Sequence, residues 1–199
     1  MSNLPKVYWA CYVGARSMAN LITQEEGRSR ESLLADRSFI RRIGRDSMDK
    51  VDPKYCPKLY LYEGRFTDFA FAPIGLLLFN QRVVDAFQGE LEKNGELYPV
   101  DCKDAPQTYY YYRVTTFVEA MDLAKISKQD DRYQNGSTYN SMSTELFTFI
   151  PENVADLLAF KDSQQNPSRV VFLGKKFIDV AKEYRFTGLH KETFKPIWP

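Results

Sequence analysis

The chain has 199 residues, of which 44% are hydrophobic, 15% aromatic and 27% charged. This composition excludes wholesale disorder, and the length suits one domain whose core needs no disulfide or metal. Lysine and arginine number 27 and aspartate and glutamate 26, and the resulting net charge of +1 excludes a strongly basic nucleic-acid-binding protein as judged over the whole chain.

The N-terminal part of the chain predicts strands and one basic helix. Residues 7–13 are rich in β-branched and aromatic side chains, which is typical of a strand, and residues 58–62 predict another. Residues 31–50 have helical apolar spacing with arginines around it. We place a domain boundary near residue 65. Residues 1–65 then form a strand and basic helical segment packed on a core domain of residues 66–199.

The next segment predicts a capped helix. Asn80 can accept hydrogen bonds from the first helical turn, and Phe79 and Val84 are spaced for a hydrophobic staple. The apolar residues of one helical face are Val83, Val84, Phe87 and Leu91. Asn94-Gly95 ends this helix at a residue that tolerates positive φ.

Two strands are expected to follow. Residues 97–102 are a strand candidate, and residues 109–118 are the clearest strand of the chain because almost all are aromatic or β-branched. Its two-sided apolarity predicts a central position. The tyrosines at 109–112 alternate between faces, so at most two share a side, which favours core packing over base stacking. The polar residues 125–142 predict a long loop.

The C-terminal part predicts a strand at residues 146–150, a short helix that starts at Pro151 and includes residues 153–160, and a buried strand at 170–173. A further helix is expected over residues 175–184, with Phe177, Ile178, Ala181 and Tyr184 on one face. Because strands and helices mix without regular βαβ alternation, we expect an α+β fold: a single compact domain with a mainly antiparallel sheet, packed helices and an N-terminal strand-helix extension.

Charge is unevenly distributed along the chain. Residues 66–165 carry a net charge of −7, whereas residues 1–65 and 166–199 each carry +4. Packing of the three segments against one another would compensate part of this charge. The alternative interpretation is an acidic surface that meets a basic partner.

Common catalytic and metal-binding patterns are missing from the sequence. His190 is the one histidine, no two of the three cysteines form a CxxC pair, and neither GxGxxG nor a Walker A motif occurs. We therefore predict no enzymatic activity, no cofactor and no metal. The carboxylates Glu119 and Asp122 leave a small carboxylate-dependent hydrolase open as an alternative. With no signal peptide and no apolar run of about 20 residues, we expect a cytoplasmic protein that does not enter the membrane.

A second alternative comes from a basic segment between Arg28 and Arg45. It holds six arginines over 18 positions, offset by Glu31 and Asp36. This segment suits a nucleic-acid-binding or phosphate-binding adaptor. A solvated helix face that packs on the acidic middle explains it equally well, and the whole-chain charge disfavours a nucleic-acid partner.

Several short motifs resemble one family of immunity proteins of bacterial polymorphic toxin systems, the family numbered eleventh among them. The resemblance covers about residues 66–199. Its motifs are Pro73-Ile74 with residues 78–87, Leu97-Tyr98-Pro99-Val100, residues 110–114 with Glu119-Ala120-Met121-Asp122, Val170-Val171-Phe172-Leu173, and Phe186-Thr187-Gly188-Leu189. The chain departs from the family at Gly174, where a capping Ser or Asp is usual, and at His190-Lys191, where an aromatic residue often follows the turn.

The resemblance implies that the protein binds and neutralises a cognate secreted antibacterial toxin, such as a type VI effector, and so protects cells during bacterial competition. Its partner would be the toxin domain. Acidic residues combined with Tyr and Arg, which make good interface anchors, place the expected toxin-binding surface around the polar loop. The expected toxin-binding residues are Glu119, Asp122, Asp130, Asp131, Arg132, Tyr133 and Tyr139.

Overall fold

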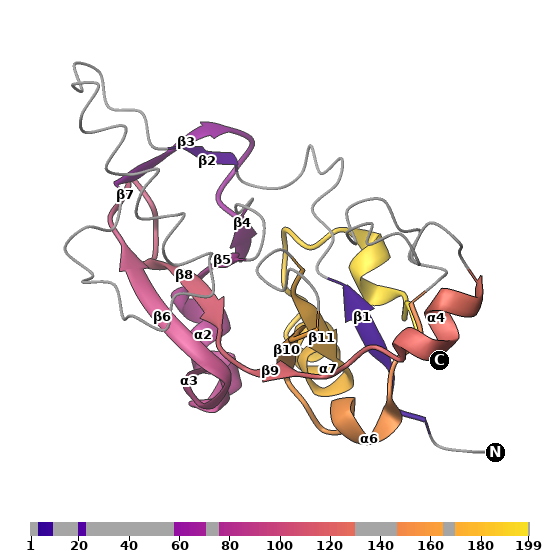
Figure 1. The fold of residues 1–199 in the computed structure, drawn as a ribbon. Coiled ribbons are helices and arrows are strands. Elements are labelled where there is room, and N and C mark those ends of the chain that lie inside the picture. Colours follow the sequence, from indigo (N-terminus) through magenta and orange to yellow (C-terminus); the bar gives the residue numbers. More distant parts are fainter. Residues whose placement is uncertain are drawn as a thin grey trace, which may run out of the picture.

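The computed structural model describes residues 4–9, 20–22, 58–70, 76–129, 147–164 and 170–198. Over these residues, mostly antiparallel strands form sheets against which helices pack, which confirms the predicted α+β class (Figure 1). In this described part, the parallel strand pairs are β9 with β10 and β3 with β7.

The central sheet has the order β4-β5-β8-β6 and is antiparallel throughout. Its strands are β4 (Phe69–Ala70), β5 (Leu77–Asn80), β6 (Gly95–Val100) and β8 (Tyr109–Val114). The central position predicted for the tyrosine strand is confirmed for β8. Tyr109 and Tyr111 face one core cluster while Tyr112 faces another, as strand alternation requires.

A second sheet has the order β1-β11-β10-β9 and joins the two ends of the chain. Its strands are β1 (Val7–Trp9), β9 (Phe117–Val118), β10 (Ala159–Asp162) and β11 (Phe172–Gly174). In it, Val7 pairs with Gly174. A small third sheet contains β2 (Asn20–Ile22), β3 (Leu59–Glu63) and β7 (Cys102–Lys103).

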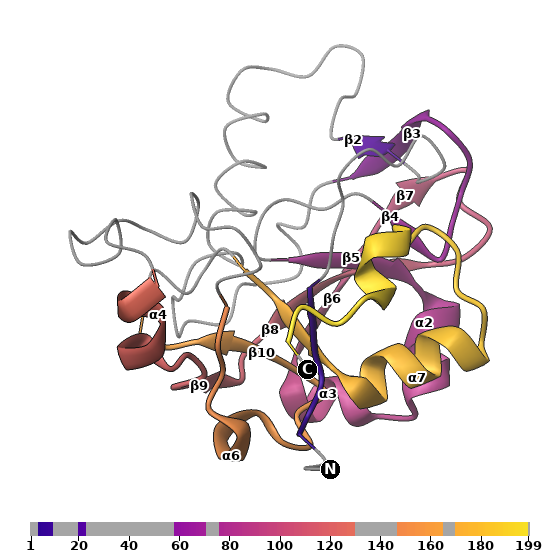
Figure 2. The same ribbon diagram turned by 90° about the vertical axis from the view of Figure 1, so that its right-hand side faces the viewer.

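Helices lie on both sides of these sheets. Figure 2 shows α2 and α7 on one side and α4 on the other. The helices are α2 (Gln81–Phe87), α3 (Glu90–Asn94), α4 (Leu123–Gln129), α6 (Pro151–Val154), α7 (Lys175–Glu183) and the 3-10 helix η5 (Lys191–Phe194). Across the described segments, no helix combines the length and the apolar character that a membrane crossing requires.

The main core is aromatic and connects the central sheet with α2 and α7. Phe69 is fully buried, and its ring lies 5.5 Å from that of Phe79, 6.1 Å from that of Phe177 and 5.8 Å from that of Phe186. A further cluster under the second sheet includes Phe149, Phe160, Phe172 and Trp198. Contacts of this kind contribute about 0.5–1.5 kcal/mol each beyond the area they bury.

The predicted capped helix forms, but it is interrupted. The Asn80 side chain accepts a hydrogen bond from Val83 N at 3.3 Å, which confirms the cap. The single helix expected up to Asn94 is instead two helices, because Gln88 (φ 48°) and Gly89 (φ 83°) are both left-handed. The prediction that Gly95 ends the helix because it tolerates positive φ is also wrong. Its φ is −177°, and the reason for glycine is space, since a Cβ there would lie 2.4 Å from the Arg113 carbonyl oxygen.

The predicted long strand at 109–118 is two strands in different sheets. β8 ends at Val114, and β9 then pairs with β10. The chain leaves the central sheet where Thr115 N donates to the Asn94 carbonyl at 3.0 Å.

Three other local expectations are corrected. Part of the expected loop at 125–142 is helical, because α4 extends to Gln129, and residues 130–142 lie outside the described residues. Within the strand expected at 146–150, Phe149 makes only an isolated bridge with Met121. The helix that starts at Pro151 ends at Val154, and residues 159–162 are strand β10, because the chain turns at Asp156 with φ 61°.

The C-terminal helix follows its predicted pattern except at its last residue. Phe177, Ile178 and Ala181 are buried as expected. Tyr184 instead lies beyond the helix as its C-cap and is 37% exposed.

Candidate interaction surface

Residues 119–122, which follow β9, present two carboxylates from a buried backbone. Ala120 and Met121 are fully buried, whereas Glu119 is exposed and Asp122 half-buried. The structure thus places these two predicted site residues in one short segment, with their side chains at or near the surface.

A buried carboxylate fixes the 119–122 segment. Asp162 is 2% exposed, and its Oδ1 accepts hydrogen bonds from Ala120 N at 2.8 Å and Met121 N at 3.1 Å. Ile150 N donates to the Ala120 carbonyl and Asp122 N donates to the Thr148 carbonyl, each at 2.8 Å. Hydrogen bonds to a carboxylate are among the stronger ones, so they constrain the backbone of this segment.

Asp122 also has a local structural role. Its Oδ1 accepts a hydrogen bond from Lys125 N at 3.1 Å at the start of α4, and Lys125 Nζ lies 2.7 Å from its Oδ2. Part of its charge is therefore already used within the fold. Glu119 is the better candidate for contact with a partner.

Helix α6 carries the acid Glu152 and approaches the 119–122 segment, and Asp156 follows this helix by two residues. Asn153 Nδ2 donates to the Glu119 carbonyl oxygen at 2.7 Å, which brings α6 against this segment. The acidic surface, as we define it, consists of Glu119, Asp122, Glu152 and Asp156. Of these, Glu119, Glu152 and Asp156 are exposed and make no ion pair with any other described residue.

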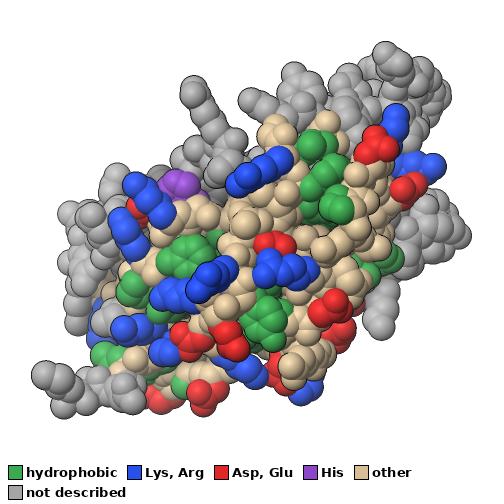
Figure 3. Space-filling view, turned by 180° about the vertical axis from the view of Figure 1, so that it is seen from behind, with side chains coloured by type: hydrophobic (Ala, Val, Ile, Leu, Met, Phe, Trp, Pro, Cys, Tyr) green, Lys and Arg blue, Asp and Glu red, His purple; other side chains and the backbone are tan. Residues whose placement is uncertain are grey.

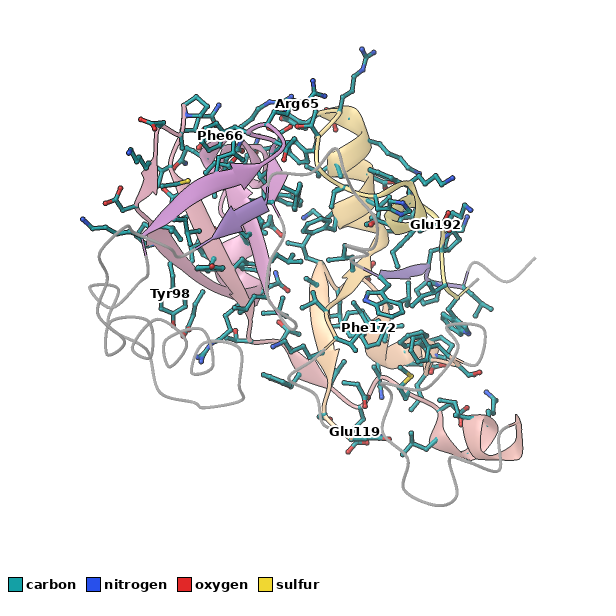
Figure 4. The ribbon with its side chains drawn as sticks, turned by 90° about the horizontal axis from the view of Figure 1, so that it is seen from above. Arg65, Phe66, Tyr98, Glu119, Phe172 and Glu192 are labelled. Atoms are coloured by element: carbon teal, nitrogen blue, oxygen red, sulfur yellow. The ribbon has the colours of Figure 1, made fainter. Side chains whose placement is uncertain are left out.

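Phe117 in β9 lies two residues before this surface and is 38% exposed. Lys161 Nζ lies 5.7 Å from the centroid of its ring. Figure 4 shows Glu119 at one edge of the molecule. An exposed aromatic ring near fixed carboxylates is the kind of arrangement that a protein interface uses as an anchor.

The other predicted site residues, Asp130, Asp131, Arg132, Tyr133 and Tyr139, lie outside the described residues. The same holds for the basic segment between Arg28 and Arg45. Sequence reasoning missed Glu152 and Asp156, because the approach of α6 to Glu119 depends on a contact between Asn153 and Glu119, which are 34 residues apart in the chain.

Two departures from the family motifs have structural explanations. A Cβ at Gly174 would lie 1.8 Å from the Leu157 carbonyl oxygen, so neither Ser nor Asp can replace this glycine without moving the backbone. His190 Nδ1 accepts a hydrogen bond from Glu192 N at 3.3 Å and so caps η5. His190 thus has a structural role at the start of η5.

Another buried carboxylate, Asp68, connects α2 to the turn after α7. Its Oδ2 accepts hydrogen bonds from Thr187 N at 2.8 Å, Thr187 Oγ1 at 2.9 Å and Arg82 Nη1 at 2.8 Å, and its Oδ1 accepts from Asn80 Nδ2 at 3.2 Å. Burial alone would raise the pKa of Asp68, but these hydrogen bonds outweigh burial and hold the pKa below its ordinary value. Asp68 thus stays ionised and unsuited to general-acid chemistry.

Within the described segments, no group of three or more His, Cys, Asp or Glu side chains is arranged to hold a metal ion. A scan against protein-family models finds no match for this chain, and a search of curated proteins finds none. Any functional assignment therefore depends on the motifs and on the geometry described above.

Proposed function

We propose that this protein is a cytoplasmic immunity protein that binds and neutralises a cognate antibacterial toxin, such as an effector of a type VI or other polymorphic toxin system. The observation that carries the proposal is the acidic surface. Its exposed residue Glu119 precedes a backbone segment, Ala120 and Met121, that Asp162 fixes from inside the fold. The motif resemblance supports the same class of protein.

A protein inhibitor needs a rigid surface with complementary charge and a few anchors. Glu119, Glu152 and Asp156 carry negative charge that no described cation pairs with, and Phe117, two residues before Glu119, exposes an aromatic ring. A toxin with a basic substrate-binding face would be attracted to this surface. Occupation of that face by a rigid protein would exclude the toxin's substrate.

Among the described residues, the ion pairs between the acidic middle of the chain and its basic ends do not involve the acidic surface. Ion pairs with the basic segments occur at Lys58–Asp101, with an Nζ–Oδ2 distance of 3.6 Å, and at Lys176–Glu90, with an Nζ–Oε2 distance of 2.9 Å. Both lie away from the acidic surface in the sequence. These ion pairs neutralise part of the opposed charge of the segments, and none of the described ones involves Glu119, Glu152 or Asp156.

If a neighbouring gene encodes a toxin domain, titration calorimetry with that domain tests the proposal. We expect charge reversal of Glu119 and Glu152 to lysine to weaken binding by at least about tenfold, which corresponds to 1.4 kcal/mol. Charge reversal of Asp130 and Asp131 is also expected to weaken it. Glu92→Lys is a matched control, because Glu92 is an exposed acid on α3 outside the acidic surface. Equal affinity for the double variant and the control would remove this surface as the toxin-binding site.

A further inference from the structure

The turn after α7 places an arginine where the backbone favours glycine. Arg185 N donates to the Lys182 carbonyl at 3.2 Å and Phe186 N donates to the Ala181 carbonyl at 3.0 Å, which is the Schellman pattern of a helix C-terminus. Arg185 occupies the left-handed position of this motif with φ 51°. Glycine is the usual residue there, because a Cβ destabilises this conformation.

The Arg185 side chain is charged and exposed at the end of this helix. It makes no ion pair or hydrogen bond with any other described residue. Stability alone would therefore select glycine at this position. A strained residue with an unused, charged side chain indicates a role outside the fold.

Tyr184, the residue before Arg185, is exposed, but its ring and its carbonyl oxygen both make contacts within the fold. Its ring stacks on Phe186, with 5.8 Å between the ring centroids and 25° between the planes. Its carbonyl oxygen accepts a hydrogen bond from Arg82 Nη2 at 2.6 Å, and the Arg82 guanidinium lies 5.4 Å from the Phe186 ring centroid. Arg82 is itself paired with the buried Asp68 at 2.8 Å. The exposed tyrosine thus stands on a rigid base.

Two further cations belong to the same part of the fold: Lys182 is two residues before Tyr184, and Arg65 is three residues before Asp68, which binds Thr187. Lys182 and Arg65 are exposed and form no ion pair with another described residue. Figure 4 places Arg65 beside the gold helix α7, and Figure 3 shows lysine and arginine side chains, interspersed with aspartate and glutamate, on the face that carries α2 and α7. We call Arg65, Lys182, Tyr184 and Arg185 the basic corner.

We propose that the basic corner binds an acidic surface of a partner protein, with the Arg185 guanidinium paired to a carboxylate and Tyr184 as the aromatic anchor. Arginine forms bidentate hydrogen bonds with carboxylates, and Arg and Tyr are the residues most enriched at interface hot spots. Figure 4 shows Arg65 of the corner and Glu119 at opposite edges of the molecule. The basic corner is therefore separate from the acidic surface, and this inference does not rest on the proposed function.

The charge pattern favours a protein over a nucleic acid. Glu183 is exposed between Lys182 and Tyr184, and it would repel a continuous row of phosphates. Nucleic-acid binding commonly neutralises about 6–10 phosphates, whereas the basic corner offers three cations. A folded protein can place single carboxylates opposite Lys182 and Arg185 and leave room beside Glu183.

The test is a titration of the full chain, followed by NMR, with a 16-residue peptide in which Glu and Asp alternate with Leu and Phe. The same peptide with Gln and Asn, and a 16-base-pair DNA duplex, are the comparison probes. The acidic peptide should shift the resonances of Tyr184 and Arg185. We expect Arg185→Gly to weaken peptide binding by at least about tenfold while it raises the melting temperature by about 2–4 °C.

Gln88→Gly is the matched control, because Gln88 is also exposed and left-handed but lies outside the basic corner. It should leave peptide affinity unchanged. Three results would overturn the inference: an Arg185→Gly variant that binds as well as the wild type, equal binding of the amide peptide, or tighter binding of the DNA at the same residues. A loss of stability in Arg185→Gly would refute the claim that the arginine is kept against the preference of the backbone.

Discussion

Replacement of Asp68 by asparagine is expected to destabilise the fold through the turn that follows α7. The carboxylate accepts two hydrogen bonds from Thr187 and one each from Arg82 and Asn80. Asparagine keeps one carbonyl oxygen but turns an amide donor toward groups that are themselves donors. Each hydrogen bond to a charged group contributes about 1.5–3 kcal/mol. Arg82 is 43% exposed, so its ion pair contributes less than a buried one would.

We therefore expect Asp68→Asn to lower the free energy of unfolding by about 2–3 kcal/mol at pH 7, which is roughly one charged hydrogen bond. The measurement is urea denaturation of both proteins. Glu152→Gln is the control, because Glu152 is exposed and makes no ion pair with another described residue, and its effect should stay within about 0.5 kcal/mol.

The difference in the free energy of unfolding between wild type and Asp68→Asn should also depend on pH, which provides a second check. The pKa of Asp68 is lower in the folded protein than its ordinary value. A carboxylate with a lowered pKa stabilises the fold at pH values above its unfolded pKa of about 3.9, and this contribution disappears as the pH falls through the folded pKa. The difference between wild type and Asp68→Asn should thus shrink below about pH 4. A difference under 0.5 kcal/mol at pH 7, or one that does not change at low pH, would refute this reasoning.

Two other predictions concern single residues. Gly174→Ser should lower the free energy of unfolding by about 3 kcal/mol or more in urea denaturation, because its Cβ would meet the Leu157 carbonyl at 1.8 Å; a stable variant would show that the backbone there can move. Burial, with Asp101 and Asp104 nearby, raises the pKa of Cys102 to about 11. Iodoacetamide at pH 8, followed by peptide mass spectrometry, should therefore modify Cys102 about a hundredfold more slowly than in urea-unfolded protein, and equal rates would contradict this burial.

Features that depend on neighbouring residues could be predicted from the sequence. The Asn80 cap and the buried face of α7, with Phe177, Ile178 and Ala181, follow from side chains within one or two turns of helix. The central position of β8 followed from its two-sided apolarity.

Features that depend on contacts between residues far apart in the chain could not be predicted from the sequence. Residues 159–162 form a strand because they pair with β9 and β11, and nothing in their own sequence indicates these partners. Gly95 and Gly174 are required by carbonyl oxygens that come from elsewhere in the chain. Likewise, the sequence predicted Glu119 and Asp122 as site residues, but the approach of Glu152 depends on how α6 packs.

The most direct test of the proposed function is growth of bacteria that co-express this chain with a toxin domain encoded by a neighbouring gene. We predict that the wild-type chain and Glu92→Lys restore growth, whereas the chain with both Glu119→Lys and Glu152→Lys, expressed at the same level and folded, does not. Continued toxicity in the presence of the wild-type chain would contradict the immunity function. Full protection by the double variant would retain the function but contradict its assignment to the acidic surface.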